Sequence, residues 1–281
     1  MAQRTWLITG VNRGFGRHLT EQLLARGDRV AGTVRDLHAA DDLRAAAPRD
    51  ALWLARLDVT DTDAVRRVVD RAFAELGTID VIVSNAGYGL FGAAEELTDA
   101  QIRQQIDTNL LGSIQFIRAA LPHLRRQQRG RIVQFSTVGG QAAFAGGSLY
   151  HATKWGIEGF VDALAQEVAV FGIGCTLVEP GGARTDFRYR SSQLSPKLDA
   201  YDASPARAVH RIVEERTSVP PGDPAKMARI IIDSADQEPA PRRLALGSDA
   251  YGAMHRQLSE RLAALEAQKA LALSTDGPAH A

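Results

Sequence analysis

Short apolar runs alternate with longer segments of helical periodicity along most of this sequence. The runs are almost continuously apolar, as in DVIVS and RIVQF, which is expected when both faces of a parallel sheet are covered. Such alternation predicts an α/β fold in which helices flank a doubly wound parallel sheet of about seven strands. We expect strands near residues 4–9, 29–34, 51–57, 79–84, 131–136, 173–179 and 243–247. We expect helices near residues 15–26, 61–76, 99–128, 149–171, 224–235 and 249–270.

A glycine-rich turn follows the first predicted strand. The strand RTWLIT leads into this turn, and a helical pattern begins near Phe15. Glycines let the backbone approach a pyrophosphate, and the start of a helix offers free N–H groups and a positive dipole. We therefore predict a dinucleotide site, although a tight strand–helix turn that binds nothing has the same pattern. The candidate residues are Gly10, Asn12, Arg13, Gly14, Phe15 and Gly16.

Tyr150 and Lys154 lie four residues apart in YHATK, fourteen residues after Ser136. This spacing is one helical turn, so the phenol and the ammonium face the same side of a helix. A fixed cation lowers the pKa of a tyrosine from about 10, which prepares the hydroxyl for proton transfer near neutral pH. Ser136 ends an apolar run and is expected at the tip of a strand. The three side chains predict proton transfer to a carbonyl, or from an alcohol, while hydride moves elsewhere.

Five separated motifs together resemble the short-chain dehydrogenase/reductase family. They are Thr9-Gly-x-x-x-Gly-x-Gly, Asn85-Ala86-Gly87, Asn109, Ser136 and Tyr150-x-x-x-Lys154, and Pro180-Gly181 also stands in the expected place. The resemblance covers roughly residues 4–190 and implies a Rossmann-like fold with NAD(P)-dependent oxidoreduction. We expect one domain over residues 1–270 and a disordered tail over residues 271–281.

The resemblance also implies roles for four catalytic residues. In the reduction direction, Ser136 would hydrogen-bond the carbonyl oxygen and Tyr150 would donate its proton to the forming alkoxide. Lys154 would lower the pKa of the tyrosine and bind the nicotinamide ribose. Asn109 would place a water that connects Lys154 to solvent, although an asparagine also distorts a helix locally. His151 is expected to face away from this group and to serve in packing or at the surface.

Further cofactor contacts follow from position in the motifs. Asp58, beside Val59, would hold the adenine amino group unless it only caps a turn. Asn85 is expected to have a structural role close to the cofactor. By resemblance to the family, Thr185 would contact the nicotinamide carboxamide. Outside the glycine turn, the expected cofactor residues are Arg35, Asp58, Val59, Asn85, Ala86, Gly87, Tyr150, Lys154, Pro180, Gly181 and Thr185.

Two arginines favour NADPH over NADH as the cofactor. Arg13 lies within the glycine turn, and Arg35 follows the second predicted strand. Two guanidinium groups can make charge-assisted contacts with the 2′-phosphate of NADP. An acid at the end of this strand would instead bind the ribose hydroxyl groups of NAD, so Asp36 would favour NADH if the strand ended one residue later.

Apolar residues after the strands suggest a hydrophobic substrate pocket, although ordinary loop packing gives the same pattern. The substrate loop is expected over about residues 182–224, as a lid that closes over the site. These features predict an NADPH-dependent carbonyl reductase or alcohol dehydrogenase that acts on a hydrophobic ketone or aldehyde. Two alternatives remain: an NAD-dependent alcohol or hydroxysteroid dehydrogenase working in oxidation, and a non-enzymatic dinucleotide sensor. The candidate substrate residues are Tyr88, Val138, Phe144 and Phe187.

The composition excludes several other classes. Lysine and arginine number 33, aspartate and glutamate also number 33, and nothing indicates a nucleic-acid partner. No apolar stretch reaches the roughly 18 residues of a membrane span, so we expect a cytoplasmic enzyme. No residues have metal-ligand spacing, so we expect no catalytic metal. By resemblance, the chain should form a homodimer or homotetramer.

Overall fold

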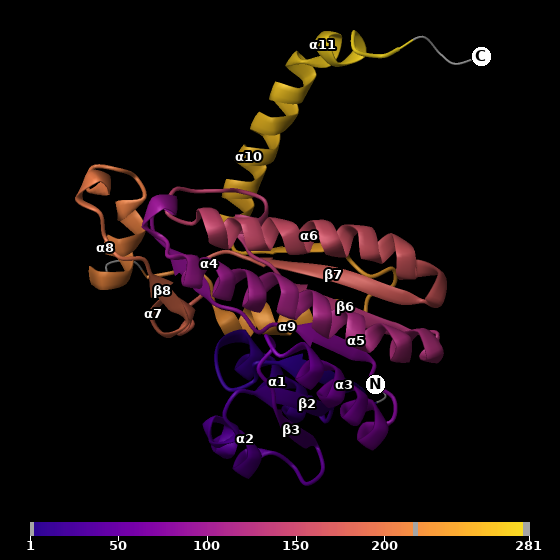
Figure 1. Cartoon of the computed structure of the whole chain (residues 1–281). Helices are drawn as coiled ribbons and strands as arrows, with labels where there is room; N and C mark the ends of the chain where they lie inside the picture. The colour runs from indigo at the N-terminus through magenta and orange to yellow at the C-terminus, as the bar shows by residue number, and fades with distance from the viewer. Residues whose placement is uncertain (1–2, 216–218, 278–281) are drawn as a thin grey trace.

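The computed structural model describes residues 3–215 and 219–277. Seven parallel strands form one sheet in the order β3-β2-β1-β4-β6-β7-β9, and helices flank this sheet in a Rossmann-like arrangement (Figure 1). Each of the seven predicted strands is confirmed. The strand bounds are β1 Thr5–Thr9, β2 Arg29–Val34, β3 Leu52–Arg56, β4 Val81–Ser84, β6 Gly130–Phe135, β7 Ile173–Pro180 and β9 Arg243–Leu246.

Helices cover both faces of the sheet, since each buries an apolar stripe against it. One face shares its core with α3 (Thr62–Leu76), α5 (Gly112–Gln127) and α6 (Ser148–Val168). The opposite face packs against α1 (Gly14–Arg26) and α9 (Pro224–Ser234). The strand order reverses between β1 and β4, and ligands of doubly wound sheets bind beyond the carboxyl ends of the strands at such a point.

The helix predicted over residues 99–128 contains a π-helical turn. The helix α4 (Asp99–Ile106) passes through the π-helical residues Asp107–Leu111 before α5 begins. Such turns often occur at functional sites, and this one contains Asn109. Part of the tail that was predicted to be disordered is helical, since residues 271–273 belong to the helix α11 (Lys269–Leu273). The end of the tail, residues 278–281, lies outside the described residues.

The predicted substrate loop forms a small subdomain of its own beyond the carboxyl ends of the strands. It contains α7 (Phe187–Arg190) and β8 (Ser192–Leu194), which pairs with β5 (Gly89–Phe91) in a separate two-stranded sheet. It continues into α8 (Arg207–Glu215), whereas α10 (Ser248–Ala267) projects away from the sheet (Figure 1). Among the described residues, no helix is both long enough and apolar enough to cross a lipid bilayer.

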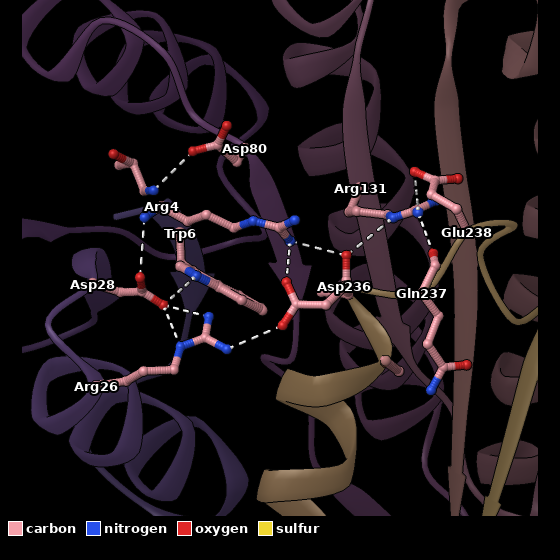
Figure 2. A network of polar contacts seen from close by, with 12 residues as sticks. Arg4, Trp6, Arg26, Asp28, Asp80, Arg131, Asp236, Gln237 and Glu238 are labelled. Atoms are coloured by element: carbon pink, nitrogen blue, oxygen red, sulfur yellow. Dashed lines mark hydrogen bonds and ion pairs between the residues drawn. The ribbon is translucent and has the colours of Figure 1, made fainter. Parts of the chain in front are cut away.

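A polar network joins the amino ends of several strands, on the side of the sheet away from the predicted site. Asp28 accepts hydrogen bonds from the backbone N–H of Arg4 and from the indole of Trp6, and it pairs with Arg26 at 2.5 Å (Figure 2). Arg4 and Arg26 both contact Asp236, which follows α9. This network ties the start of the sheet to the end of α9 and leaves the carboxyl ends free for function.

Candidate active site

The glycine turn has the backbone geometry that its sequence predicted. Gly10 and Gly14 have φ angles of +76° and +54°, in the left-handed region that favours glycine. A Cβ atom at Gly16 would lie 2.1 Å from the carbonyl oxygen of Gly10, so a side chain does not fit there. Among the described residues, no side chain caps the start of α1, and no acid lies in its first turn. The free N–H groups therefore suit a pyrophosphate.

Arg13 and Arg35 lie exposed beside this turn. Within the described part of the chain, neither guanidinium has an ion-pair or side-chain hydrogen-bond partner. The strand β2 ends at Val34, so Arg35 is the first residue after it. The carboxylate of Asp36 accepts a hydrogen bond from the backbone N–H of His38 over 3.1 Å and caps a short 3₁₀ turn. The strand therefore does not extend one residue further, as it would have to if Asp36 were the ribose ligand.

Tyr150 and Lys154 lie buried on one face of α6, as their spacing predicted. The ammonium Nζ is 5.9 Å from the centre of the tyrosine ring and donates to the carbonyl oxygen of Phe135 over 3.0 Å. Phe135 is the last residue of β6, so this bond fixes α6 against the carboxyl end of the sheet. The arrangement joins a phenol and an ammonium at the point where doubly wound folds bind ligands.

The pKa of Tyr150 differs in direction from the prediction. Burial raises the pKa of the phenol above its usual 10, and a hydrogen bond with Thr137 opposes this change. Burial also lowers the pKa of Lys154 to about 8, although the negative charge of Glu158 acts in the opposite direction. Desolvation disfavours the charged form of each group, and it sets the direction of both changes. Burial therefore favours a neutral phenol and a neutral amine at this site.

Ser136 lies one residue beyond the end of β6 and is 5% exposed. Its hydroxyl donates to Oε1 of Glu158 over 2.5 Å. The sequence prediction instead gave the serine proton to a substrate carbonyl. Glu158 was not a predicted site residue, although it lies four residues after Lys154 and therefore on the same helix face.

Asn109 is fully buried in the π-helical turn. Its amide donates to the carbonyl oxygen of Tyr88 over 2.7 Å and accepts from the N–H of Tyr88 over 3.0 Å. The side chain thus fixes the segment between β4 and β5. A Cβ atom at Gly87 would lie 3.1 Å from Oδ1 of Asn109 and 3.9 Å from Nζ of Lys154, so these three residues adjoin.

Most of the remaining predicted cofactor residues make hydrogen bonds to other parts of the protein. The amide of Asn85 donates to the carbonyl oxygens of Thr9 and Gly10, over 2.8 and 3.2 Å. Asp58 is exposed and accepts from both the N–H and the hydroxyl of Thr60, so it caps a turn while remaining accessible. The N–H of Gly181 donates to Leu246, and the hydroxyl of Thr185 accepts from the N–H of Phe187. Val59, Ala86 and Pro180 adjoin these residues in the chain.

Two phenylalanine rings border Tyr150. The ring centres of Phe91 and Phe187 lie 5.5 and 6.1 Å from that of Tyr150. Val138 and Phe144 lie elsewhere, at a cavity of about 350 Å³ whose other wall is α10. Phe144 packs against the ring of His151, which is buried as the packing alternative predicted.

Comparison with known proteins identifies the family of this chain. Residues 4–194 match the short chain dehydrogenase family. The chain belongs to this family. Oxidoreductase BOA17 of Botryotinia fuckeliana is 35% identical to this short-chain dehydrogenase and covers 88% of it, over 90% of its own length. The 3-ketodihydrosphingosine reductase of Bacteroides thetaiotaomicron is 34% identical, with 74% of this chain and 76% of that protein covered.

Solved structures agree that the chain belongs to the short-chain dehydrogenase family. A short-chain dehydrogenase from Streptomyces avermitilis matches with a TM-score of 0.91 and 39% identity, covering 98% of this chain and 99% of the other. The closed form of a serine dehydrogenase complexed with NADP⁺ matches with a TM-score of 0.71 and 26% identity, covering 86% and 93%. This short-chain dehydrogenase is thus an oxidoreductase whose structural neighbours support use of a nicotinamide dinucleotide cofactor.

Sequence reasoning missed a polar contact that anchors the segment predicted as the substrate loop of this short-chain dehydrogenase. Arg207 of α8 and Glu96 form an ion pair at 2.7 Å, and their side chains are 6% and 1% exposed. Glu96 also accepts from the N–H of Leu198 and the hydroxyl of Ser195. Although burial opposes it, these bonds hold the pKa of Glu96 at about 2. The partners lie 111 residues apart, and no local pattern indicates such a pair.

Proposed function

We propose that this chain is an NADPH-dependent carbonyl reductase that also acts as an alcohol dehydrogenase on hydrophobic ketones, aldehydes and their alcohols. The observation that carries the proposal is the pairing of Tyr150 with Lys154 at the carboxyl end of β6, where the side chain of Thr137 hydrogen-bonds Tyr150. Proton transfer by a positioned side chain requires this kind of geometry. The uncapped start of α1 and the glycine turn suit the cofactor pyrophosphate.

The residues of the chain have separate tasks in this mechanism. A nicotinamide cofactor held at the glycine turn would supply or accept the hydride. Tyr150 gives its phenolic proton to the substrate oxygen in reduction and takes it back in oxidation. Lys154 holds a positive charge next to the phenol and fixes α6 through its bond to Phe135. Thr137, whose side chain hydrogen-bonds Tyr150, takes the substrate-binding role that the sequence gave to Ser136, and Asn109 fixes the loop that closes this end of the sheet.

The preference for NADPH over NADH is supported by the charges beside the glycine turn. Arg13 and Arg35 are exposed, while the carboxylate of Asp36 is engaged with the N–H of His38. Guanidinium groups bind a phosphate through several hydrogen bonds, and each charge-assisted bond contributes roughly 1.5–3 kcal/mol. The ribose 2′-phosphate is the part of the cofactor that would use these cations.

The hydrophobic substrate class is supported by the rings of Phe91 and Phe187 around Tyr150. A relative named for reduction of 3-ketodihydrosphingosine points the same way. Self-association as a homodimer or homotetramer belongs to the proposal, since Leu111 and Trp155 are large apolar side chains exposed on the outer helices.

The test is a spectrophotometric assay of the purified chain with NADPH and NADH in parallel, against a panel of aldehydes and ketones. We expect carbonyl-dependent loss of the reduced-nicotinamide absorbance that is faster with NADPH. A KM for NADH equal to or below that for NADPH would contradict the cofactor assignment. Absence of turnover with the whole panel, in protein that binds NADPH, would contradict the proposed activity.

A further inference from the structure

The helix α10 carries an apolar stripe that faces solvent. Tyr251, Leu258, Leu262 and Leu265 follow one another at intervals of seven, four and three residues, so they lie on one side of the helix. Each is a large apolar residue that is between 45% and 66% exposed. Intervals of three, four and seven residues are those of a coiled-coil seam, in which one helix packs against another.

The rest of the chain does not cover this stripe, because α10 projects away from the sheet (Figure 1). The last contacts with the body are those of Arg261. Its guanidinium lies 4.1 Å from the ring centre of Trp155 and donates from Nη2 to the carbonyl oxygen of Gln141 over 2.9 Å. From residue 262 to residue 277, every described residue is exposed. Arg261 thus fixes the direction of the helix, and the outer part extends beyond it without support.

The outer part of α10 needs a partner for its stability. An isolated helix shorter than roughly 12–15 residues is only marginally stable in water, and most helices in proteins are stabilised by packing of an apolar face. In a single copy, the apolar stripe contributes almost nothing to such packing. The stripe therefore indicates a surface that packs along the helix.

The charges of this segment favour a protein over a lipid surface as that partner. Helices that lie on membranes are rich in lysine and arginine on their polar face. Residues 248–273 instead carry equal numbers of acids and bases, so they have no net attraction to anionic lipids. The acids are Asp249, Glu260 and Glu266, and the bases are Arg256, Arg261 and Lys269.

The edges of the stripe match a second copy of this chain. Arg261 flanks the stripe on one edge and Glu266 flanks it on the other, five residues further along. Opposite charges at these flanking positions form ion pairs between the helices of a coiled coil, and they set the partner and its orientation. In a parallel pair, Arg261 of each copy meets Glu266 of the other, whereas in an antiparallel pair the two Arg261 side chains repel. A guanidinium has five N–H donors, so the bond to Gln141 leaves others for this contact.

We propose that α10 is a dimerisation arm, whose apolar stripe packs in parallel against α10 of a second copy of this chain. The inference goes beyond the proposed function, which assigns no surface on α10, and it is independent of the proposed activity. The interface is isologous, since both copies contribute the same residues. Leu258, Leu262 and Leu265 each meet their own counterparts, and Lys269 at the next seam position ends the apolar contact.

Cysteine cross-linking tests the pairing and its orientation. In a parallel pair each stripe residue faces its own counterpart, so Leu258→Cys and Leu265→Cys should each give a reducible dimer on oxidation with copper phenanthroline. The native Cys175 is buried, so the wild type should give none. Ala267→Cys, on the opposite side of α10, is the matched control and should also give none. The proposal is wrong if neither stripe variant cross-links, or if Ala267→Cys cross-links equally.

Sedimentation equilibrium of the full chain gives a second test. Leu258→Glu combined with Leu262→Glu should raise the dissociation constant of one association step at least about 30-fold, as loss of a central interface residue does. Ala263→Glu combined with Ala267→Glu adds the same charge on the other side of α10 and should associate as the wild type does. All these positions are exposed in a single copy, so circular dichroism and the melting temperature should not change.

Other occupants of the stripe would give different results. A wild type that is monomeric at every concentration measured would overturn the proposal. Binding to vesicles of phosphatidylcholine and phosphatidylserine that the two leucine substitutions abolish, without a change in association, would assign the stripe to a membrane and would also overturn it. Failure of the proposed function is a separate result, since it appears as absence of turnover in the carbonyl panel whatever the state of association.

Discussion

At the scale of single residues, hydrogen-bond direction and burial decide what each side chain can do. Tyr150, Lys154 and Ser136 are of the types that acid–base chemistry on a carbonyl or alcohol requires. Their burial and their hydrogen-bond partners, which the residue types alone do not reveal, come from the structure. The phenol is desolvated, the ammonium is bonded to a backbone carbonyl, and the serine proton is directed to a carboxylate. Each of these facts changes the expected chemistry.

Replacement of Tyr150 by phenylalanine removes the proton donor and leaves the ring in place. General acid catalysis contributes roughly 10²–10⁴-fold, so kcat should fall by at least about 100-fold. The dissociation constant of NADPH, measured by fluorescence titration, should change little. Turnover close to that of the wild type would contradict the assignment of Tyr150.

The two arginines beside the glycine turn should control the choice of cofactor. Arg13→Ala and Arg35→Ala each remove a guanidinium that has no partner among the described residues, so the fold should be unaffected. We expect KM for NADPH to rise about tenfold or more in each variant, since a charge-assisted bond contributes roughly 1.5–3 kcal/mol. KM for NADH should stay constant and serves as the internal control. An equal rise for both cofactors would show that the arginines do not recognise the 2′-phosphate.

At the scale of helices and strands, periodicity predicted the fold well and contacts between distant residues poorly. All seven strands of the sheet were predicted, because continuous apolar runs mark strands that are covered on both faces. A local distortion at Asn109 was named only as an alternative, and its π-helical form was not predicted, since it changes the backbone path without changing the apolar pattern. Glu158 could have been found from its spacing to Lys154, whereas its acceptance of the Ser136 proton depends on a loop conformation that no local pattern contains.

The predicted lid provides a test at this scale, because the buried ion pair of Glu96 with Arg207 anchors it. Glu96→Gln removes the buried partner of Arg207 and leaves it the exposed carboxylate of Asp202, and the loss of a buried partner costs about 3–5 kcal/mol. The segment should open more often, and trypsin should cleave it faster after Lys197, Arg207 or Arg211. Glu214→Gln is the control, because Glu214 pairs with Lys197 at the surface, where an ion pair contributes little. Equal cleavage rates in the two variants would mean that the pair does not hold the lid.

At the scale of the whole molecule, the two ends of the sheet carry different tasks. The amino ends are joined by the network around Asp28 and Arg26, whose buried side-chain atoms all have partners among the described residues (Figure 2). The carboxyl ends carry Ser136, Glu179 and their neighbours, and Oε2 of the buried Glu179 has no hydrogen-bond partner in the described part of the chain. One guanidinium, that of Arg243, contacts three carboxylates there. The functional end therefore contains a buried carboxyl group whose ionisation costs stability.

Glu179 should make the stability of the molecule depend on pH. Burial, followed by the negative charge of Glu158, raises the pKa of its carboxyl from 4.5 to about 7. The folded state therefore binds this proton more tightly than the unfolded chain does. Its contribution to stability is fully present below about pH 4.5 and is lost as the pH rises to about 7. The substitution Glu179→Gln removes this dependence.

Urea unfolding at a series of pH values measures the effect. Relative to the wild type, the Glu179→Gln variant should gain stability steadily between pH 4.5 and 7 and show a constant difference above that range. Glu167→Gln, at an exposed position on α6, should follow the wild-type curve throughout. Parallel curves for Glu179→Gln and the wild type would mean that Glu179 ionises normally in the fold.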